Sequence, residues 1–259
     1  MNESLASRPR GIGSGGLRTW GMMFMATGIA GCAVVQNGIL KLSNLSGTQL
    51  LQLMQQDSEV MAIATLALVL QAVYCCATPV FAFLLVEGFT HTSDFVKYLL
   101  RVVGLALLSE IPYNLAMEGS LWALDSRNPV FGVAVCLIVL YFYRRYGEKT
   151  AGNVAIKVAV TLAALFWMSM LGIAEGAPLL VMTVVLWCLR SKPSLRLFGG
   201  CMAAVLCMVF SLFYIVAPMS FIAIHMYNGE KSDENKWINY LAYPVVLVSL
   251  WLCGWMIGQ

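Results

Sequence analysis

The side chains best placed to do chemistry are polar residues inside otherwise apolar segments. Glu110 lies roughly 20 Å along the third apolar segment when it is built as a helix, and Asn114 follows one turn later on the same face. Asn128 opens the next segment from the same side, and Gln36 and Asn37 reach a similar depth on the first. Polar groups at one depth predict either hydrogen bonds that hold helices together or the wall of a substrate pocket.

A second polar pair is expected nearer the opposite end of these helices. Glu87 lies about one turn before the end of the second apolar segment, and Arg101 lies one to two turns into the third. A short loop joins the two segments, so they are predicted to be antiparallel neighbours with both charges at similar depth. We therefore expect a Glu87–Arg101 ion pair, which would clamp the helices or take part in binding.

The remaining candidates are less specific. His91 and His225 are predicted at the membrane interface. All eight cysteines lie in apolar segments without a CxxC pair, so no metal site is expected. Two clusters of basic residues in the loops could hold the phosphates of a nucleotide-like cofactor or of anionic lipid, or could simply set the topology. They comprise Arg144, Arg145, Lys149, Arg190, Lys192 and Arg196.

The amino-acid composition indicates the kind of fold that positions these residues. Of the 259 residues, 60% are hydrophobic and 11% charged, and the mean hydropathy is +0.79. Such a chain cannot cover a water-facing surface, so it is predicted to be an all-α, polytopic transmembrane bundle with about eight (seven to nine) spanning helices. No nucleic-acid partner is expected, because the basic residues flank apolar segments. The helices are predicted over residues 20–42, 47–56, 60–89, 95–117, 129–143, 154–171, 177–189, 197–227 and 237–257.

Proline and charge refine this arrangement. Pro79, Pro112 and Pro218 are expected to kink or divide their helices. Most Lys and Arg residues fall on one side of the bundle, whereas Lys41 and Arg127 fall on the other. The positive-inside rule then predicts a multi-pass cell-membrane protein with its N-terminus in the cytoplasm. Residues 1–18 are predicted to form a cytoplasmic arm and residues 19–259 a single transmembrane domain.

Several strings resemble one known family. The segment Thr78–Thr92 (TPVFAFLLVEGFTHT) is similar to a signature of the TraX family, and Tyr98–Arg101 (YLLR) and Ser109–Asn114 (SEIPYN) continue the likeness. Weaker matches follow at residues 128–131 (NPVF), at residues 227–229 (YNG) and at Tyr243-Pro244. The similarity runs in order over most of the chain and is most specific in residues 78–114.

The resemblance implies a bacterial inner-membrane acyltransferase that takes an acyl group from cytoplasmic acyl-CoA or acetyl-CoA. Glu110 would then be the general base. The acceptor, which would be a small molecule, a lipid or a protein, would lie against Gln36, Asn37, Tyr113, Asn114 and Asn128. The six basic loop residues named above would hold the CoA phosphates.

Two stretches depart from the family pattern. Gly31–Gly38 lacks the Asp-His pair of helix 1, and Val246 stands where the family has a histidine after its YP motif. Three functions therefore remain open: an acyltransferase, a non-catalytic scaffold or binding protein, and a transporter of small solutes or lipids. A continuous tunnel from the basic loops to Glu110 would favour the enzyme, and a closed, dry core would favour the scaffold.

Overall fold

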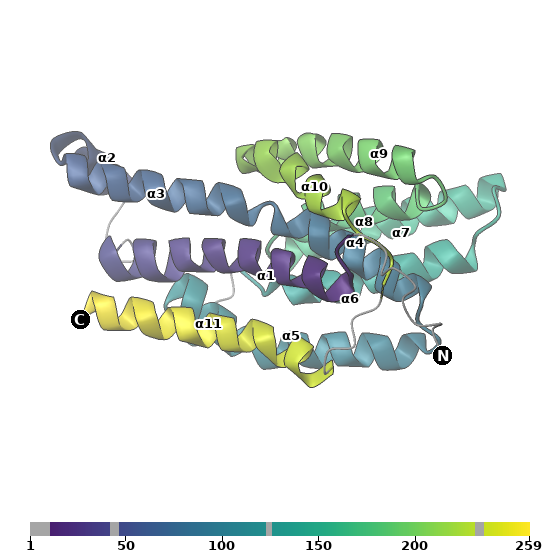
Figure 1. Ribbon diagram of the computed structural model, residues 1–259, viewed down its shortest axis with the longest axis horizontal. Coiled ribbons are helices and arrows are strands. Elements are labelled where there is room, and N and C mark those ends of the chain that lie inside the picture. The colour runs from purple at the N-terminus through teal and green to yellow at the C-terminus, as the bar shows by residue number, and fades with distance from the viewer. Residues whose placement is uncertain (1–10, 42–46, 123–125, 231–235) are drawn as a thin grey trace, which may run out of the picture.

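The computed structural model describes residues 11–41, 47–122, 126–230 and 236–259, which form an elongated bundle of helices (Figure 1). The first half contains α1 (Ser14–Ala30), the π-helix η1 (Gly31–Ile39), α2 (Gly47–Gln56), α3 (Ser58–Tyr74), α4 (Ala77–Thr90) and α5 (Phe95–Glu118). The second half contains α6 (Pro129–Arg145), α7 (Ala151–Met170), α8 (Gly176–Cys188), α9 (Pro193–Leu206), the 3-10 helices η3 (Cys207–Val209) and η4 (Leu212–Met219), α10 (Ser220–His225) and α11 (Lys236–Gly258). The predicted all-α class is confirmed for these residues.

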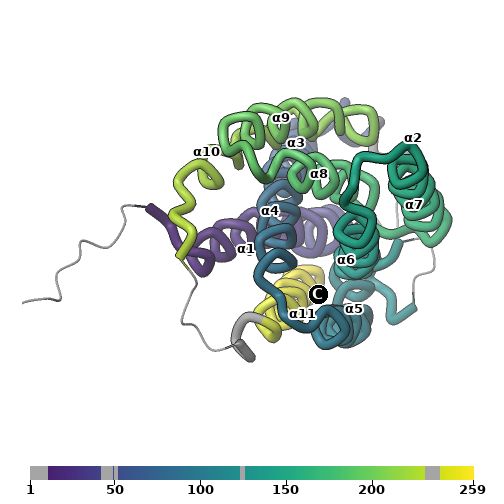
Figure 2. Tube along the Cα trace, turned by 90° about the vertical axis from the view of Figure 1, so that its right-hand side faces the viewer, coloured from purple at the N-terminus to yellow at the C-terminus, as the bar shows by residue number. Residues whose placement is uncertain are grey.

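Helix α4 lies at the centre of the bundle. Viewed along the bundle, it is surrounded by α1, α6, α8 and α11 (Figure 2). Its sequence is apolar on every face, which is the pattern of a helix buried all round. Val80, Ala82 and Phe89 are fully buried in the main core cluster. Thr78, a polar side chain of α4, is buried with them in the protein interior.

The segment predicted as one kinked helix over residues 60–89 is two helices. The chain breaks between α3 and α4, at Cys75 and Cys76, four residues before Pro79. The proline ring excludes the carbonyl of the residue four positions earlier, and Pro79 has no N–H to donate to it. The break therefore opens at Cys75. It also gives α4 an N-terminal end inside the bundle.

The helices have the composition of membrane segments. Four stretches of the described chain are long and apolar enough to span a bilayer: Ser14–Ile39, Ser58–Thr90, Ala151–Met170 and Tyr240–Gly258. Shorter apolar helices add Gly176–Cys188, Pro193–Val209 and Leu212–His225. Large apolar side chains such as Leu107, Phe166 and Val209 are exposed, as lipid-facing residues are. The predicted count of about eight spans stays a prediction.

The ends of several elements differ from their predicted positions. Helix α1 begins at Ser14, inside the predicted arm of residues 1–18. Before it, Ile12 pairs with the chain after α10: the Ile12 amide donates to Met226 at 2.8 Å, and the Asn228 amide donates to Ile12 at 3.1 Å. The predicted element 197–227 is instead four short helices, α9, η3, η4 and α10. The predicted short helix at residues 47–56 matches α2.

Candidate functional site

A cavity of about 510 Å³ runs through the interior beside α4. Its outer end is lined by the first turns of α1, the end of α4, the start of α5 and the chain around Tyr227, and includes the exposed residues His91 and Arg101. Its inner end is lined by Tyr74, Thr78, Glu175 and Tyr243, together with apolar side chains of α1, α6 and α8. We call these the mouth and the floor.

The cavity gathers the segments on which the family resemblance depends. Thr78, Glu87 and Gly88 line it from α4, and His91 and Thr92 from the turn that follows. Tyr98 and Arg101 line it from α5, Tyr227 and Gly229 from the loop after α10, and Tyr243 from α11. These strings are far apart in the sequence, so the fold brings them to one place. This cavity is therefore the candidate functional site.

The floor holds a carboxylate with a defined set of partners. Glu175 accepts a short hydrogen bond from the hydroxyl of Tyr214, which is fully buried. The Tyr214 oxygen is also 3.0 Å from the hydroxyl of Thr78. Because Tyr214 gives its single proton to the carboxylate, Thr78 must donate to Tyr214. The second oxygen of Glu175 has no hydrogen-bond partner among the residues that the structure describes.

The backbone conformation of Glu175 is unfavourable for a residue with a side chain. This residue has φ 55° and ψ 11°, in the left-handed region that glycine or asparagine adopts more easily. Holding a glutamate there costs about 1–3 kcal/mol, and such residues concentrate at functional sites. Glycine would make the same turn into α8 with less strain, so the turn alone does not explain a glutamate here.

Two loops hold Glu175 in position. Arg127, in the loop before α6, bridges the loop after α7: its amide donates to Gly172 at 2.8 Å, and the Ala174 amide donates back to Arg127 at 2.9 Å. Gly172 takes a φ of 61°, which permits this turn. The chain then enters α8 directly after Glu175. The start of α6 and the start of α8 are thus fixed to each other at the floor.

The mouth carries cationic and aromatic side chains. Arg18 from α1 and Arg101 from α5 are its cations, and Tyr98 and His91 line it beside them. Helix α5 begins at a cap in which Asp94 accepts from the Lys97 amide at 3.1 Å, and its carboxylate lies 3.1 Å from the Lys97 ammonium. The backbone hydrogen bond and then the ammonium lower the pKa of Asp94. This cap fixes the turn that presents Tyr98 and Arg101.

The predicted Glu87–Arg101 ion pair is wrong. Glu87 instead pairs with Arg196 of α9, with 2.8 Å between Oε1 and Nη1. The Arg196 guanidinium also lies 4.7 Å from the ring centre of Phe83. Arg101 lines the same cavity on an exposed position of α5 and makes no ion pair with a described residue. Glu87 and Arg101 were predicted at a similar depth, but the residue that meets Glu87 is Arg196, at the start of α9.

We expect Arg196→Met to lower the free energy of unfolding by about 2–3 kcal/mol. This is below the cost for a fully buried pair, because Arg196 and Glu87 keep 18% and 21% of their side chains exposed. Thermal unfolding in detergent measures this loss of stability, with Arg101→Met as the matched control. Exchanging Glu87 and Arg196 should recover part of the loss. A larger loss in Arg101→Met than in Arg196→Met would contradict this pairing.

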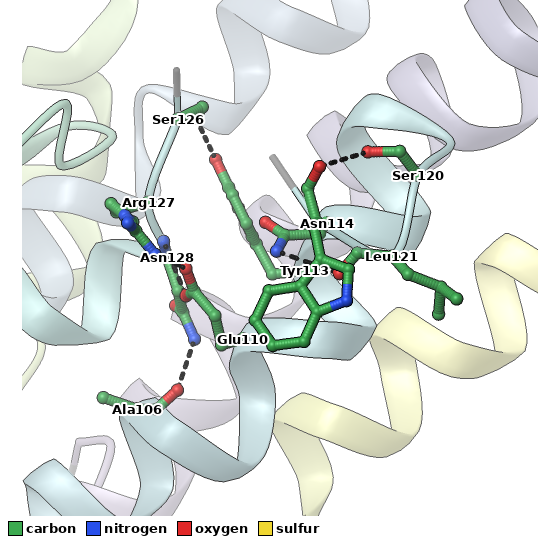
Figure 3. A network of polar contacts seen from close by, with 10 residues as sticks. Ala106, Glu110, Tyr113, Asn114, Ser120, Leu121, Ser126, Arg127 and Asn128 are labelled. Atoms are coloured by element: carbon green, nitrogen blue, oxygen red, sulfur yellow. Dashed lines mark hydrogen bonds and ion pairs between the residues drawn. The ribbon is translucent and has the colours of Figure 1, made fainter. Parts of the chain in front are cut away.

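Glu110 belongs to a different group of contacts, which holds a loop in place (Figure 3). It accepts from Arg127 Nη1 at 3.3 Å and from the Asn128 amide at 3.2 Å. The Asn128 side chain donates to Ala106 at 3.3 Å and accepts from the Tyr243 hydroxyl at 3.0 Å. Glu110 and Asn128 do meet as predicted, but neither lines the cavity. The cavity therefore does not form the tunnel to Glu110 that would have favoured the enzyme.

The other predicted acceptor-binding residues also lie outside the cavity. Asn37 donates to the carbonyls of Ala116 and Met117 at 3.4 and 3.3 Å, near the end of α5. Tyr113 lies 3.1 Å from the Ser126 hydroxyl, and Asn114 donates to Leu121 at 3.5 Å (Figure 3). Gln36 has no hydrogen bond to a described residue. Asn37, Tyr113 and Asn114 thus connect helices and loops, which was the first of the two predicted roles.

The six basic residues assigned to a cofactor do not line the cavity either. Arg144 stacks on Phe89 at 4.4 Å, and Arg190 stacks on Trp187 at 3.9 Å. Phe89 and Trp187 are themselves in edge contact, so these cations gather around the end of α4. Their grouping at one end fits the charge asymmetry of the sequence. Arg145, Lys149 and Lys192 are exposed.

Glu175 is the main residue that sequence reasoning missed. It was overlooked because it lies in a short connection between two apolar segments rather than within a predicted helix. A signal was present: Glu175 is the only charged residue between Lys157 and Arg190. A single carboxylate in so long an uncharged stretch has a specific reason to be there, because ionisable groups at membrane depth are costly.

Comparison with known proteins agrees with the motifs that line the cavity. No curated protein and no solved structure matches the chain. The model of one protein family, described as TraX protein, matches residues 51–254, which is well over half of the chain. This match includes α3 to α10 and most of α11, and with them Tyr74, Thr78, Glu175 and Tyr243 of the floor. The chain therefore belongs to the TraX family of membrane proteins.

Proposed function

We propose that this TraX-family protein is a membrane-embedded acyltransferase that moves an acyl group from acyl-CoA to an amine or hydroxyl acceptor. One observation carries the proposal: a single cavity of about 510 Å³ joins a cationic mouth to a carboxylate in the interior. This volume lies within the range of small-molecule sites, roughly 300–1,000 Å³. A purely structural bundle would have no need of such a cavity.

The mouth supplies the donor site in this proposal. The guanidinium groups of Arg18 and Arg101 bind the CoA phosphates, because guanidinium groups form paired hydrogen bonds with phosphate oxygens. The extended pantetheine arm then follows α4 inward with its thioester. From Glu87 to Thr78, this path covers about 14 Å at the rise of an α-helix. The N-terminus and the mouth would face the cytoplasm, as the distribution of Lys and Arg predicts.

The floor supplies the base. The unpaired oxygen of Glu175 takes a proton from the acceptor while the acceptor nitrogen or oxygen attacks the thioester carbonyl. A C–N or C–O bond forms, the C–S bond breaks, and CoA leaves as a thiol after the proton passes to its sulfur. Tyr214 and Thr78 hold the carboxylate in one orientation throughout. Glu175 thus takes the role of general base that the sequence analysis gave to Glu110. The Glu110 carboxylate already accepts hydrogen bonds from Arg127 and from the Asn128 amide.

A non-catalytic binding protein is the second candidate, and the packing of two stretches favours it. The stretch without the family's Asp-His pair, Gly31–Gly38, forms η1, which packs against α11. Val246, in place of the other family histidine, packs against an apolar cluster that includes Ala33 and Leu247. No histidine is present at either place. If the family's chemistry depends on those histidines, this chain keeps the cavity but only binds ligands.

Binding of acetyl-CoA to the purified protein in lipid nanodiscs tests the proposal. We expect saturable binding that Arg101→Met weakens at least fivefold, because this side chain lines the mouth. Arg190→Met is the matched control and should leave the affinity unchanged, since Arg190 stacks on Trp187 outside the cavity. Absence of saturable binding would overturn the proposal. So would an equal effect of the two substitutions.

A further inference from the structure

A patch of cations lies at the end of the bundle where α6 ends, α7 begins and α8 ends (Figure 1). These three helices pack against one another in pairs. We propose that the patch, made of Arg144, Lys157 and Arg190, binds the phosphate headgroup of an anionic phospholipid. None of the three residues lines the cavity, so the inference does not depend on acyl transfer.

Aromatic rings hold the two guanidinium groups of the patch in place. Arg144 lies 4.4 Å from the ring centre of Phe89, and Arg190 lies 3.9 Å from that of Trp187. Phe89 and Trp187 are buried and in edge contact, with 5.4 Å between their ring centres, so both arginines stack on one aromatic pair. Stacking uses the face of a guanidinium and leaves the N–H groups at its edge for hydrogen bonds. These edges suit phosphate oxygens, which guanidinium groups bind in pairs.

The positive charge of the patch is not compensated by the described part of the chain. Arg190 uses one donor, Nη1, which lies 2.9 Å from the Trp187 carbonyl oxygen. The side chains of Arg144 and Lys157 make no hydrogen bond or ion pair with a described residue. Glu148, in the connection between α6 and α7, is exposed and makes no ion pair with a described residue either. An anion bound at the patch would therefore meet donors that have no other partner.

Lys157 adds a third cation from α7. Its ammonium lies 6.0 Å from the ring centre of Tyr143 on α6, and Lys157 and Arg190 both interact electrostatically with Cys188 at the end of α8. The Thr161 hydroxyl donates to the Lys157 carbonyl at 2.8 Å, so the Tyr143 hydroxyl, 3.0 Å away, must donate to Thr161. These hydrogen bonds fix α7 against α6 at the level of the patch.

Exposed apolar side chains beside the cations favour a lipid over a free phosphate. Val154, Val158 and Leu162 are exposed at 47%, 51% and 59%, and their spacing of four residues puts them in one row along α7. The row begins at the level of Lys157 and runs along the helix, as a lipid tail below its headgroup would. Basic pockets between transmembrane helices bind anionic headgroups in this way. A free phosphate would gain nothing from the apolar row.

The positive-inside rule alone does not explain this arrangement. It requires only that cations be numerous on the cytoplasmic side, and Arg145, Lys149 and Lys192, which are exposed, already satisfy it. Arg144 and Arg190 are instead stacked on buried rings, which restricts their positions. Two fixed guanidinium groups beside an apolar row have the form of a site rather than of a diffuse charge.

Binding of phosphatidylglycerol and of phosphatidylcholine with the same tails to the full chain in detergent tests the inference. The first headgroup is anionic and the second zwitterionic. We expect phosphatidylglycerol to bind at least tenfold more tightly, as measured by native mass spectrometry of the lipid-bound protein. Arg190→Met and Lys157→Met should each weaken its binding about fivefold and leave phosphatidylcholine unchanged. Lys97→Met is the matched control, because it removes a cation at the start of α5 that is already paired with Asp94.

The use of two variants keeps the test decisive if Arg190→Met does not fold, because the Lys157 ammonium makes no hydrogen bond with a described residue. Glycerol phosphate, the headgroup chemistry without tails, separates a lipid site from a phosphate site and should compete at least a hundredfold more weakly than the lipid. Equal competition by glycerol phosphate would overturn the inference. So would equal affinity for the two lipids, or a loss in Lys97→Met as large as in Lys157→Met. Acetyl-CoA binding is a separate readout, and failure of the lipid site would leave it unchanged.

Discussion

Glu175→Gln is expected to lower acyl transfer at least about a hundredfold while changing acetyl-CoA affinity by less than about twofold. A positioned general base contributes roughly a hundredfold or more to such reactions, and glutamine cannot accept the proton. The donor is held at the mouth, by residues that the substitution does not touch. Single-turnover transfer from labelled acetyl-CoA to a simple alkylamine measures the first quantity, and equilibrium binding of acetyl-CoA measures the second.

Glu110→Gln is the matched control for this result. It makes the same chemical change in a carboxylate of α5 that lies outside the cavity. Because Glu110 accepts from Arg127 and from the Asn128 amide, the variant should unfold at lower temperature but keep its turnover. Loss of turnover in folded Glu110→Gln, with full activity in Glu175→Gln, would return the catalytic role to the group of contacts in Figure 3.

Gly254→Leu is expected to give the largest loss of stability in the chain, about 3 kcal/mol or more. A Cβ at Gly254 would lie 2.1 Å from the Ala33 carbonyl oxygen and 2.8 Å from its carbon, both of which are backbone atoms that cannot move aside. Opposite it, a Cβ at Gly38 would meet the Gly254 oxygen at 2.8 Å. Two glycines thus let η1 and α11 pack backbone to backbone, as small residues do between membrane helices. Overpacking such a contact forces the helices apart.

The control for this substitution is Gly104→Ala in α5. A Cβ there meets nothing within 4 Å, so the change should leave stability equal or raise it by about 0.5–1 kcal/mol through helix propensity. Thermal unfolding of both variants in the same detergent makes the comparison. If Gly254→Leu unfolds at the wild-type temperature, η1 and α11 are not packed as described.

The sequence was informative wherever a property depends on local composition. Apolar segments of fixed length predicted an all-helical membrane bundle, and the short helix expected at residues 47–56 is α2. The strings around Thr78, Glu87 and Arg101 pointed to the TraX family, and the same strings line the cavity. Pro79 predicted a disturbance in its helix. All of these follow from residue type and from the geometry of a single helix.

The partners of charged residues depended on the tertiary structure. Rise per residue gives the depth of a side chain along its helix, but it does not give the direction in which that helix is turned. Glu87 and Arg101 share a depth, yet Glu87 faces Arg196, which lies 109 residues away in the sequence. In the same way, depth placed Glu110 and Asn128 together correctly but could not show that they lie beside the cavity rather than in it.

The catalytic candidate itself also came from the tertiary structure. Glu175 lies in a connection that the helical pattern does not describe, and its importance arises from Tyr214 and Thr78, which are 39 and 97 residues away. Only packing around α4 leaves an open volume that ends at this carboxylate. The sequence by itself determined the membrane bundle and its family, because hydrophobicity and motifs are carried by neighbouring residues. The structure decided which polar groups meet, because that depends on the rotation and docking of every helix at once.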